Sequence, residues 1–368
     1  MKENLNENTL VRIADNLSKV LDFDTNAFVS HAIKGLEGQE LKQRITHIIT
    51  IMHAFLPSDF AQTAKSFCAL AEVWDRGDPD DKFRGFAVWP VIDYVGIYGI
   101  DEPELALLAL EKLTHLFSAE FAIRPFIEQH PKITFEFLNQ WLSHPDEHVR
   151  RLVSEGTRPR LPWAGQLKDF IVDPTPVIPL LAALRHDNSQ YVKRSVANHL
   201  NDIGKDHPEK LIDICAEWQE QDTGSSDWVI KHATRSLVKS GHPQVFRLLG
   251  YSNKPKVSIS HFKATPDVLS LANSLNERLE FSFELESDAN KQSFVLDYAV
   301  HFTKANGKTA AKVFKFGNYQ LDKGERLSLN KSHSFKPIST RKYYPGEHIL
   351  ALHINGEEQL RCQFTVSE

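Results

Sequence analysis

A seven-residue motif recurs three times in the first two thirds of this 368-residue chain. The copies read VRRLVSE from Val149, VKRSVAN from Val192 and VIKHATR from Val229, so their first residues are 43 and 37 residues apart. A helical repeat with a period near 40 residues is typical of HEAT-like solenoids, in which each unit buries its apolar face against its neighbours. We therefore predict a HEAT-like α-helical solenoid over residues 1–251.

The repeat also predicts a row of basic side chains. Equivalent residues of stacked repeats line one face, and the third position of the motif is Arg151, Arg194 or Lys231. Such a row could bind the phosphates of a polyanion. Solvated charges on ordinary helices are the alternative, and the repeat alone leaves both interpretations open.

The pattern changes near residue 251 from helical spacing to alternation of apolar and polar residues. Alternation is typical of strands with one buried face. Seven such runs, separated by turn signals such as Asn306-Gly307, cover residues 257–262, 279–285, 294–303, 312–316, 326–329, 348–354 and 359–366. They predict an immunoglobulin-like β-sandwich over residues 256–368. The expected fold class is therefore multidomain, an α-helical solenoid followed by a β-sandwich.

The net charge of −5 argues at first against a nucleic-acid partner, but the charge is unevenly distributed. Residues 1–139 hold 13 Lys and Arg against 21 Asp and Glu, whereas residues 252–368 hold 16 against 13. A polyanion can therefore bind, provided that the basic surface is local.

The three cysteines are far apart and form no CxxC motif. A sparse, odd set indicates reduced thiols and a cytoplasmic location. The N-terminus has no signal-peptide pattern, and no apolar run is long enough to span a bilayer, so we expect no contact with a membrane.

The densest basic segment is residues 149–163, which contains four arginines, one glutamate and one tryptophan. Arginines at this density suit phosphates. Glu155 lies one turn after Arg151 and just before Arg158, Arg160 and Trp163. Nearby cations favour the charged form of a carboxylate. We therefore expect a fixed anion inside a basic surface.

Two further carboxylates are candidates for chemistry. A helix is expected from Ser118, with Glu120 in its first turn and Arg124 one turn later. Trp89 and Asp93 are four residues apart, on one face if their segment is helical. Three of the candidate residues also have an ordinary structural explanation. Glu120 could be a charge at a helix start, Glu155 a salt-bridged helix residue, and Trp89 a core residue.

Signatures of other chemistries are missing from the sequence. There is no phosphate-binding loop, no dinucleotide fingerprint, no nucleophile elbow and no HExxH motif. The cysteines offer no zinc spacing. We therefore expect neither a metal nor a cofactor.

Three segments resemble a known family: FSAEFAIRPFI at 117–127, RRLVSEGTRPRLPWA at 150–164 and VANHLNDIGKDHPE at 196–209. They are similar to the DNA alkylation repair glycosylases of the AlkC type, in the branch with a C-terminal immunoglobulin-like domain. The resemblance implies a HEAT-repeat enzyme that holds damaged duplex DNA and excises 3-methyladenine and 3-methylcytosine without a base-flipping pocket. Trp89 and Asp93 match the spacing of a Trp–Asp pair in the related AlkD branch.

These observations lead to one assignment and one alternative. We expect a monomeric, monofunctional DNA glycosylase of base excision repair that acts on alkylated double-stranded DNA. The candidate catalytic residues are Glu155, Glu120 and Asp93, and a carboxylate among them would stabilise an oxocarbenium-like transition state. The candidate DNA-binding residues are Arg151, Arg158, Arg160, Trp163, Trp89, Arg124, Arg194 and Lys231. The alternative is a HEAT-repeat scaffold that binds DNA or protein without catalysis.

Overall fold

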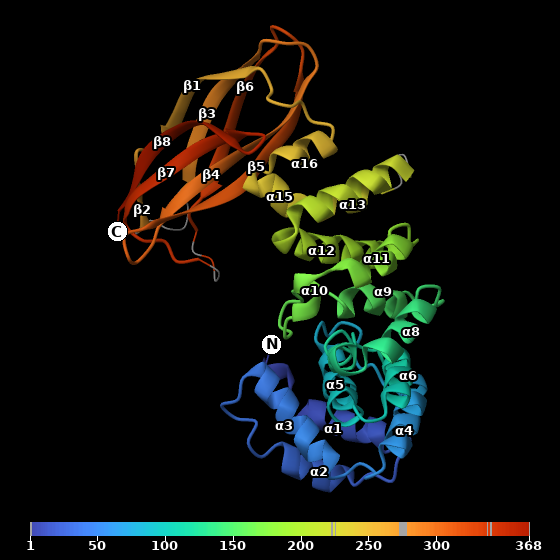
Figure 1. Ribbon diagram of the computed structural model, residues 1–368. Helices are drawn as coiled ribbons and strands as arrows, with labels where there is room; N and C mark the ends of the chain where they lie inside the picture. The colour runs from blue at the N-terminus through green and yellow to red at the C-terminus, as the bar shows by residue number, and fades with distance from the viewer. Residues whose placement is uncertain are drawn as a thin grey trace. The chain divides into compact units, whose positions relative to one another are not determined.

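The computed structural model describes residues 2–221, 224, 226–271, 278–336, 338 and 341–367. Helices cover the chain up to Leu248, and strands follow from Val257 (Figure 1). The predicted fold class is confirmed. The α-helices are α1 Glu7–Leu17, α2 Thr25–Ala32, α3 Leu41–His53, α4 Phe60–Val73, α5 Trp89–Tyr98, α6 Pro103–Leu113, α7 Arg124–Gln129, α8 Pro131–Trp141, α9 Glu147–Gly156, α10 Lys168–Val172, α11 Ile178–Leu184, α12 Gln190–Asp206, α13 Pro208–Gln221, α14 Asp227–Ala233, α15 Arg235–Ser240 and α16 Pro243–Leu248. Short 3₁₀ helices lie at Lys2–Asn4, Arg84–Ala87 and Thr175–Val177.

The chain divides into two compact units, the first of which is Met1–Asp206 with Ser225–Ala233. Within it, α9 and α14 both pack against α12. The motif anchors Val149, Val192 and Val229 are each the third residue of one of these helices, and all three are buried. The helical repeat is therefore real, and its apolar position holds successive helices together. None of the described helices is long and apolar enough to cross a membrane.

The segment between α6 and α7 differs from the prediction. No helix begins at Ser118: residues 118 and 119 are irregular, residues 120–123 form a turn, and α7 starts at Arg124. The amide of Ala119 donates to the side chain of Thr114, five residues earlier. This bond ties the segment to the end of α6 in place of a new helical start, so Glu120 lies in a turn.

The second unit, His207–Gly224 with Thr234–Glu368, contains a β-sandwich. Its strands are β1 Val257–Thr265, β2 Val268–Ser270, β3 Arg278–Ser287, β4 Gln292–Thr303, β5 Thr309–Leu321, β6 Arg326–Ser334, β7 Gly346–Ile354 and β8 Glu357–Ser367. One sheet has the order β1-β3-β6 and the other β2-β8-β7-β4-β5. Alternate residues such as Phe281, Phe283, Leu296 and Leu352 fill one core between the sheets.

The seven predicted strands all occur, and β2 is the strand that the prediction missed. It has three residues and pairs in parallel with β8, whereas the other ladders are antiparallel. Three residues are too few to show alternation.

The turn that follows α15 contacts the sandwich within the second unit. Gly241 follows α15, and Gly356 lies in the turn between β7 and β8; both have left-handed backbones, with φ of 72° and 79°. A methyl group added to Gly356 would overlap the Cα of Gly241. Nearby, the Asn355 side chain donates to the carbonyl of Ser252 and accepts from the amide of Val295. The helix turn and the strand turn therefore pack backbone against backbone.

Candidate functional site

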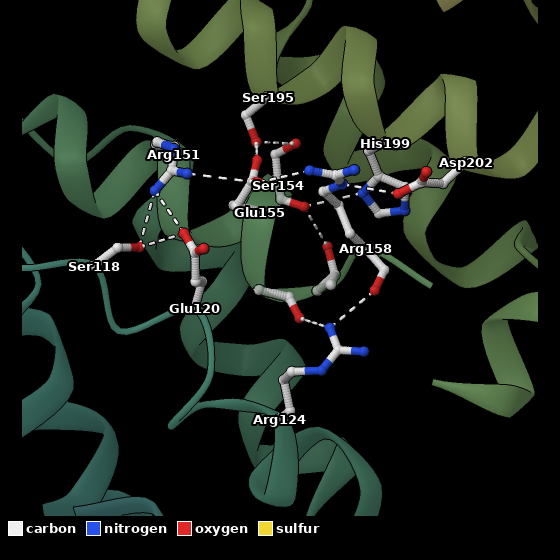
Figure 2. Close-up of polar contacts among 12 residues, drawn as sticks. Ser118, Glu120, Arg124, Arg151, Ser154, Glu155, Arg158, Ser195, His199 and Asp202 are labelled. Atoms are coloured by element: carbon white, nitrogen blue, oxygen red, sulfur yellow. Dashed lines mark hydrogen bonds and ion pairs between the residues drawn. The ribbon is translucent and has the colours of Figure 1, made fainter. Parts of the chain in front are cut away.

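Glu155 is at the centre of a polar network in the first unit (Figure 2). It lies near the end of α9 and is 5% exposed. Its Oε1 is 2.7 Å from Arg158 Nη1 and 3.5 Å from Arg151 Nη2. Its Oε2 accepts a hydrogen bond of 2.6 Å from the hydroxyl of Ser195 on α12. Two cations and one hydroxyl therefore hold this carboxylate in a fixed position, as predicted from the arginine-rich segment.

Glu120 reaches the same network through Arg151. Arg151 Nη1 is 2.9 Å from Glu120 Oε2 and donates to the Ser118 hydroxyl at 2.8 Å. The Ser118 hydroxyl donates in turn to Glu120 at 2.7 Å. The segment 118–123 thus directs Glu120 toward α9, and a single guanidinium lies between the two carboxylates.

Arg158 links Glu155 to a third carboxylate. Arg158 Nε is 2.8 Å from Asp202 Oδ2 on α12, and Lys205 Nζ is 2.7 Å from Asp202 Oδ1. Burial alone would lower the pKa of Arg158, but the adjacent carboxylates of Glu155 and Asp202 outweigh burial and raise it. We call Glu120, Glu155, Asp202, Arg151 and Arg158 the carboxylate cluster.

Arg124 and Arg158 were both predicted to bind DNA, and their positions correct that prediction. Both are buried. Arg124 donates to the carbonyls of Gly156 and Arg158 at 2.9 and 2.8 Å and to that of Gly165 at 2.6 Å; burial lowers its pKa to about 10. Arg158 points to Glu155 and Asp202. Arg124 therefore braces the turn after α9, and Arg158 braces the carboxylates.

Trp163 and Arg160 lie nearer the surface. Trp163 is 57% exposed and has a left-handed backbone, with φ of 67°. Its carbonyl accepts a hydrogen bond from Lys42, a residue of α3. Arg160 makes two hydrogen bonds of 2.7 Å to the carboxylate of Asp206. The exposed indole is available to a ligand, whereas Arg160 already has an acidic partner.

Trp89 and Asp93 form a separate pair in α5. Pro90 lies in the first turn, where proline is tolerated, so the helical register holds and Trp89 Nε1 donates to Asp93 Oδ2 at 2.7 Å. Asp93 Oδ1 is buried without a hydrogen-bond partner. Burial raises the pKa of Asp93 to about 7, although the bond from Trp89 and the charge of Lys42 lower it.

Trp89 was also predicted to contact DNA, and the structure contradicts this. The side chain is 2% exposed. Its ring packs against Phe86, Phe117 and Phe121, with centroid distances of 5.7, 5.5 and 5.6 Å. Phe117 and Phe121 lie on either side of Ser118 and Glu120 in the sequence. Trp89 is therefore a core residue that supports this segment.

The predicted basic row has different surroundings at each position. Arg151 belongs to the carboxylate cluster. Arg194 and Lys231 are exposed on α12 and α14. The first member therefore stabilises carboxylates, and a phosphate-binding role for the other two stays a prediction.

Sequence reasoning missed Ser118, Ser195, His199 and Asp202. The buried imidazole of His199 contacts the carbonyl of Ser154 through Nδ1 at 3.0 Å, and burial lowers its pKa to about 3. His199 and Asp202 lie in the segment 196–209, whose likeness to the family could have singled them out. Within the described part of the chain, no group of His, Cys, Asp and Glu could hold a metal ion.

Comparisons with known proteins agree with this architecture. Residues 259–368 match the family described as "Uncharacterised protein YhaZ, C-terminal Ig-like domain". The chain is 36% identical over 368 residues to "Uncharacterized protein YhaZ" of Bacillus subtilis (strain 168), covering 100% of this chain and 99% of the relative. It is similar to the structure of Pseudomonas fluorescens alkylpurine DNA glycosylase AlkC bound to DNA containing an abasic site analog, with 37% identity, a TM-score of 0.91 and coverage of 100% and 99%. Similarity of this extent over both parts shows that the chain belongs to the AlkC family, in the branch with a C-terminal immunoglobulin-like domain.

Proposed function

We propose that this protein is a monofunctional DNA glycosylase of base excision repair. Its substrates are cationic N3-alkylated bases, 3-methyladenine and 3-methylcytosine, in duplex DNA. The observation that carries the proposal is the buried carboxylate of Glu155, held by Arg158, Arg151 and Ser195. Full-length likeness to an alkylpurine DNA glycosylase bound to abasic-site DNA supports it.

The reaction suits a site of fixed carboxylates. An N3-methylated base already carries positive charge, so it leaves as a neutral base when the bond between C1′ and the ring nitrogen breaks and the electron pair moves to the base. The sugar becomes oxocarbenium-like, and an anion near C1′ stabilises it. Water then adds its oxygen to C1′ and loses a proton. Glu155 supplies the anion in this proposal, and Glu120 assists in orienting the water.

Arg151 has a supporting role in this scheme. Two carboxylates that face a developing cation would repel each other without a cation between them. Arg151 meets both, at 2.9 Å from Glu120 and 3.5 Å from Glu155. It therefore offsets part of the negative charge of the two glutamates in the resting site.

Phosphate contacts are proposed for exposed residues of the solenoid. Arg194 and Lys231 would hold the sugar–phosphate backbone without reading sequence. The indole of Trp163 projects from its turn and could contact the sugar or a cationic base through its face. This arrangement handles the lesion within the duplex rather than in a flipping pocket.

The sandwich is proposed to grip the same duplex with one end. The β4–β5 turn holds Lys304 and Lys308, and the segment between β6 and β7 returns to the same end, since Thr303 donates to the carbonyl of Glu347. Arg341 covers the ring of Phe302 at 4.2 Å. The basic side chains at this end are Lys304, Lys308, Lys312, Lys336, Arg341 and Lys342. Replacing Lys304 and Lys308 by Ser should weaken DNA binding and reduce its salt dependence.

The direct test is release of free base from methylated duplex DNA by the purified full-length protein. Chromatography would detect 3-methyladenine or 3-methylcytosine under single-turnover conditions. Glu155→Gln keeps shape and removes charge, so excision should slow by roughly 100-fold while DNA binding stays nearly unchanged. Glu104→Gln, an exposed position of α6, is the matched control and should behave as wild type. A wild-type protein that binds DNA and releases no base would instead be a scaffold.

A further inference from the structure

Tyr191, which the proposed mechanism does not use, lies against the carboxylate cluster. It is the second residue of α12, and its ring lies 4.5 Å from the guanidinium carbon of Arg151. His148 packs against the same ring, with centroids 5.5 Å apart and an interplanar angle of 71°. Tyr191 is 37% exposed, and its hydroxyl has no hydrogen bond to any residue in the described ranges. The ring, rather than the hydroxyl, makes its contacts.

Arg151 is thereby held by two kinds of contact. A hydrogen bond to the Ser118 hydroxyl and ion pairs with Glu120 and Glu155 hold its terminal nitrogens. The aromatic face of Tyr191 attracts the same cation through its quadrupole. Because Tyr191 comes from α12 and Glu120 from the turn before α7, Arg151 joins separate parts of the helical unit.

The contact matters most when DNA is present. A phosphate is a strong competing partner for any arginine near it. If Arg151 turned toward a phosphate, Glu120 and Glu155 would lose the cation that lies between them. A neutral ring beside Arg151 favours its position at the carboxylates without adding a charge that would alter the field at the substrate.

The equivalent position of the next repeat has a different environment. Trp228 is the second residue of α14 and is 42% exposed. Its ring stacks on His232 with centroids 5.1 Å apart and an interplanar angle of 12°. An aromatic side chain therefore recurs at this position of the repeat, and among the described residues it is Tyr191 that lies against an arginine of the carboxylate cluster.

We infer that Tyr191 is a positioning residue for base excision: it retains Arg151 between Glu120 and Glu155 when DNA binds. The inference rests on the proposed function, because excision is the property that Tyr191 protects. The inference predicts that the excision rate and the affinity for DNA respond differently to a change at Tyr191. Loss of the ring should slow excision at saturating protein, while DNA binding stays unchanged or becomes slightly tighter as Arg151 gains a phosphate.

The test compares three full-length variants. Tyr191→Phe keeps the ring and should stay within about twofold of the wild-type single-turnover rate. Tyr191→Leu removes the ring and should lower that rate by roughly 5- to 30-fold, the range expected for a partly buried cation–π contact, with the Kd for abasic-analogue DNA not increased. Trp228→Leu, the same kind of change at the equivalent repeat position, is the control and should leave the saturated rate unchanged. Should Tyr191→Leu misfold, Tyr191→Gln repeats the test.

A double-mutant cycle tests whether Tyr191 acts through Arg151. In a Glu120→Gln background, where one partner of Arg151 has lost its charge, Tyr191→Leu should have a smaller effect than in the wild type. Equal effects in both backgrounds would overturn the inference, as would weaker DNA binding with an unchanged saturated rate, which would make Tyr191 a DNA contact. If Phe were as slow as Leu, the hydroxyl would be the active group. A wild-type protein without excision would refute the proposed function instead, so the two failures are distinguishable.

Discussion

The carboxylate cluster and the Trp89–Asp93 pair are two ways of placing an acid inside the same helical unit. Glu155 receives two guanidinium groups and a hydroxyl, so both of its oxygens are occupied. Asp93 receives one indole N–H, and its second oxygen is buried without a partner. Burial with a single donor raises the pKa of Asp93 to about 7. We therefore expect Glu155 to stabilise the developing positive charge and Asp93 to have a structural role beside Trp89.

The largest expected effect comes from breaking the cluster at its most buried cation. Arg158→Met removes the partner of both Glu155 and Asp202 and leaves two buried carboxylates without it. Removing one member of a buried ion pair costs about 3–5 kcal/mol. Chemical denaturation should therefore show a loss of this size. A loss below about 1 kcal/mol would mean that water or Arg151 compensates and that the cluster is less coupled than its distances indicate.

A second prediction tests Asp93 through the pH dependence of stability. The folded pKa of about 7 is above the usual value, so the folded state holds this proton more tightly than the unfolded state does. Stability from this group is present at low pH and is lost as the pH rises toward 7. Asp93→Asn keeps an acceptor for Trp89 and should stabilise the protein at pH 8 by on the order of 2 kcal/mol. The gain should fade toward pH 4.

Urea unfolding of wild type and variant at pH 4, 5, 6, 7 and 8 measures this difference. A gain independent of pH would show that Asp93 does not titrate in this range. Strong loss of excision in Asp93→Asn at pH 8, without loss of stability, would move Asp93 into the reaction and weaken the comparison with Glu155.

A third prediction separates the two glutamates that share Arg151. Glu120 is the more accessible and pairs with Arg151, whereas Glu155 also pairs with Arg158. Glu120→Gln should slow single-turnover excision by about 10-fold, less than the change at Glu155, because it removes a secondary electrostatic contribution. Near wild-type rates for both glutamine variants would exclude them from the mechanism and bring Asp93 forward.

The smallest effect concerns the outer arginines. Arg194 is exposed, whereas Arg160 already pairs with Asp206. Arg194→Ala should weaken binding to damaged and undamaged duplexes alike and flatten the salt dependence by about one unit of slope. Arg160→Ala should change that slope less. Equal slopes for Arg194→Ala and wild type would place Arg194 away from DNA.

Local patterns predicted much of the fold. Val149, Val192 and Val229 are buried in α9, α12 and α14. They could be predicted because a period near 40 residues is typical of repeated helices. The seven predicted strands also occur, because alternation reports one buried face directly. The conformation of residues 118–123 was not predicted, because its fixing bond between Ala119 and Thr114 has no periodic signature.

The candidate site was predictable only in part. The arginine density around Glu155 marked the segment, and Glu155 indeed has cationic neighbours. The density was wrongly interpreted as surface at Arg158, because its partner Asp202 lies 44 residues away in the sequence. Ser195 is 40 residues from Glu155. Partners this distant become visible only after the repeats stack.

The contact between Gly241 and Gly356 restricts how this protein can be recombined. Exchanging the β-rich part between relatives at the change from helix to strand would separate two turns that fit only because neither carries a side chain. In such a chimaera, Gly241 would come from one parent and Gly356 from the other, so both parents would need glycine at these positions. A crossover before α15 would keep both glycines from one parent. The segment that should be exchanged as one piece therefore begins before α15, ahead of the first strand of the sandwich.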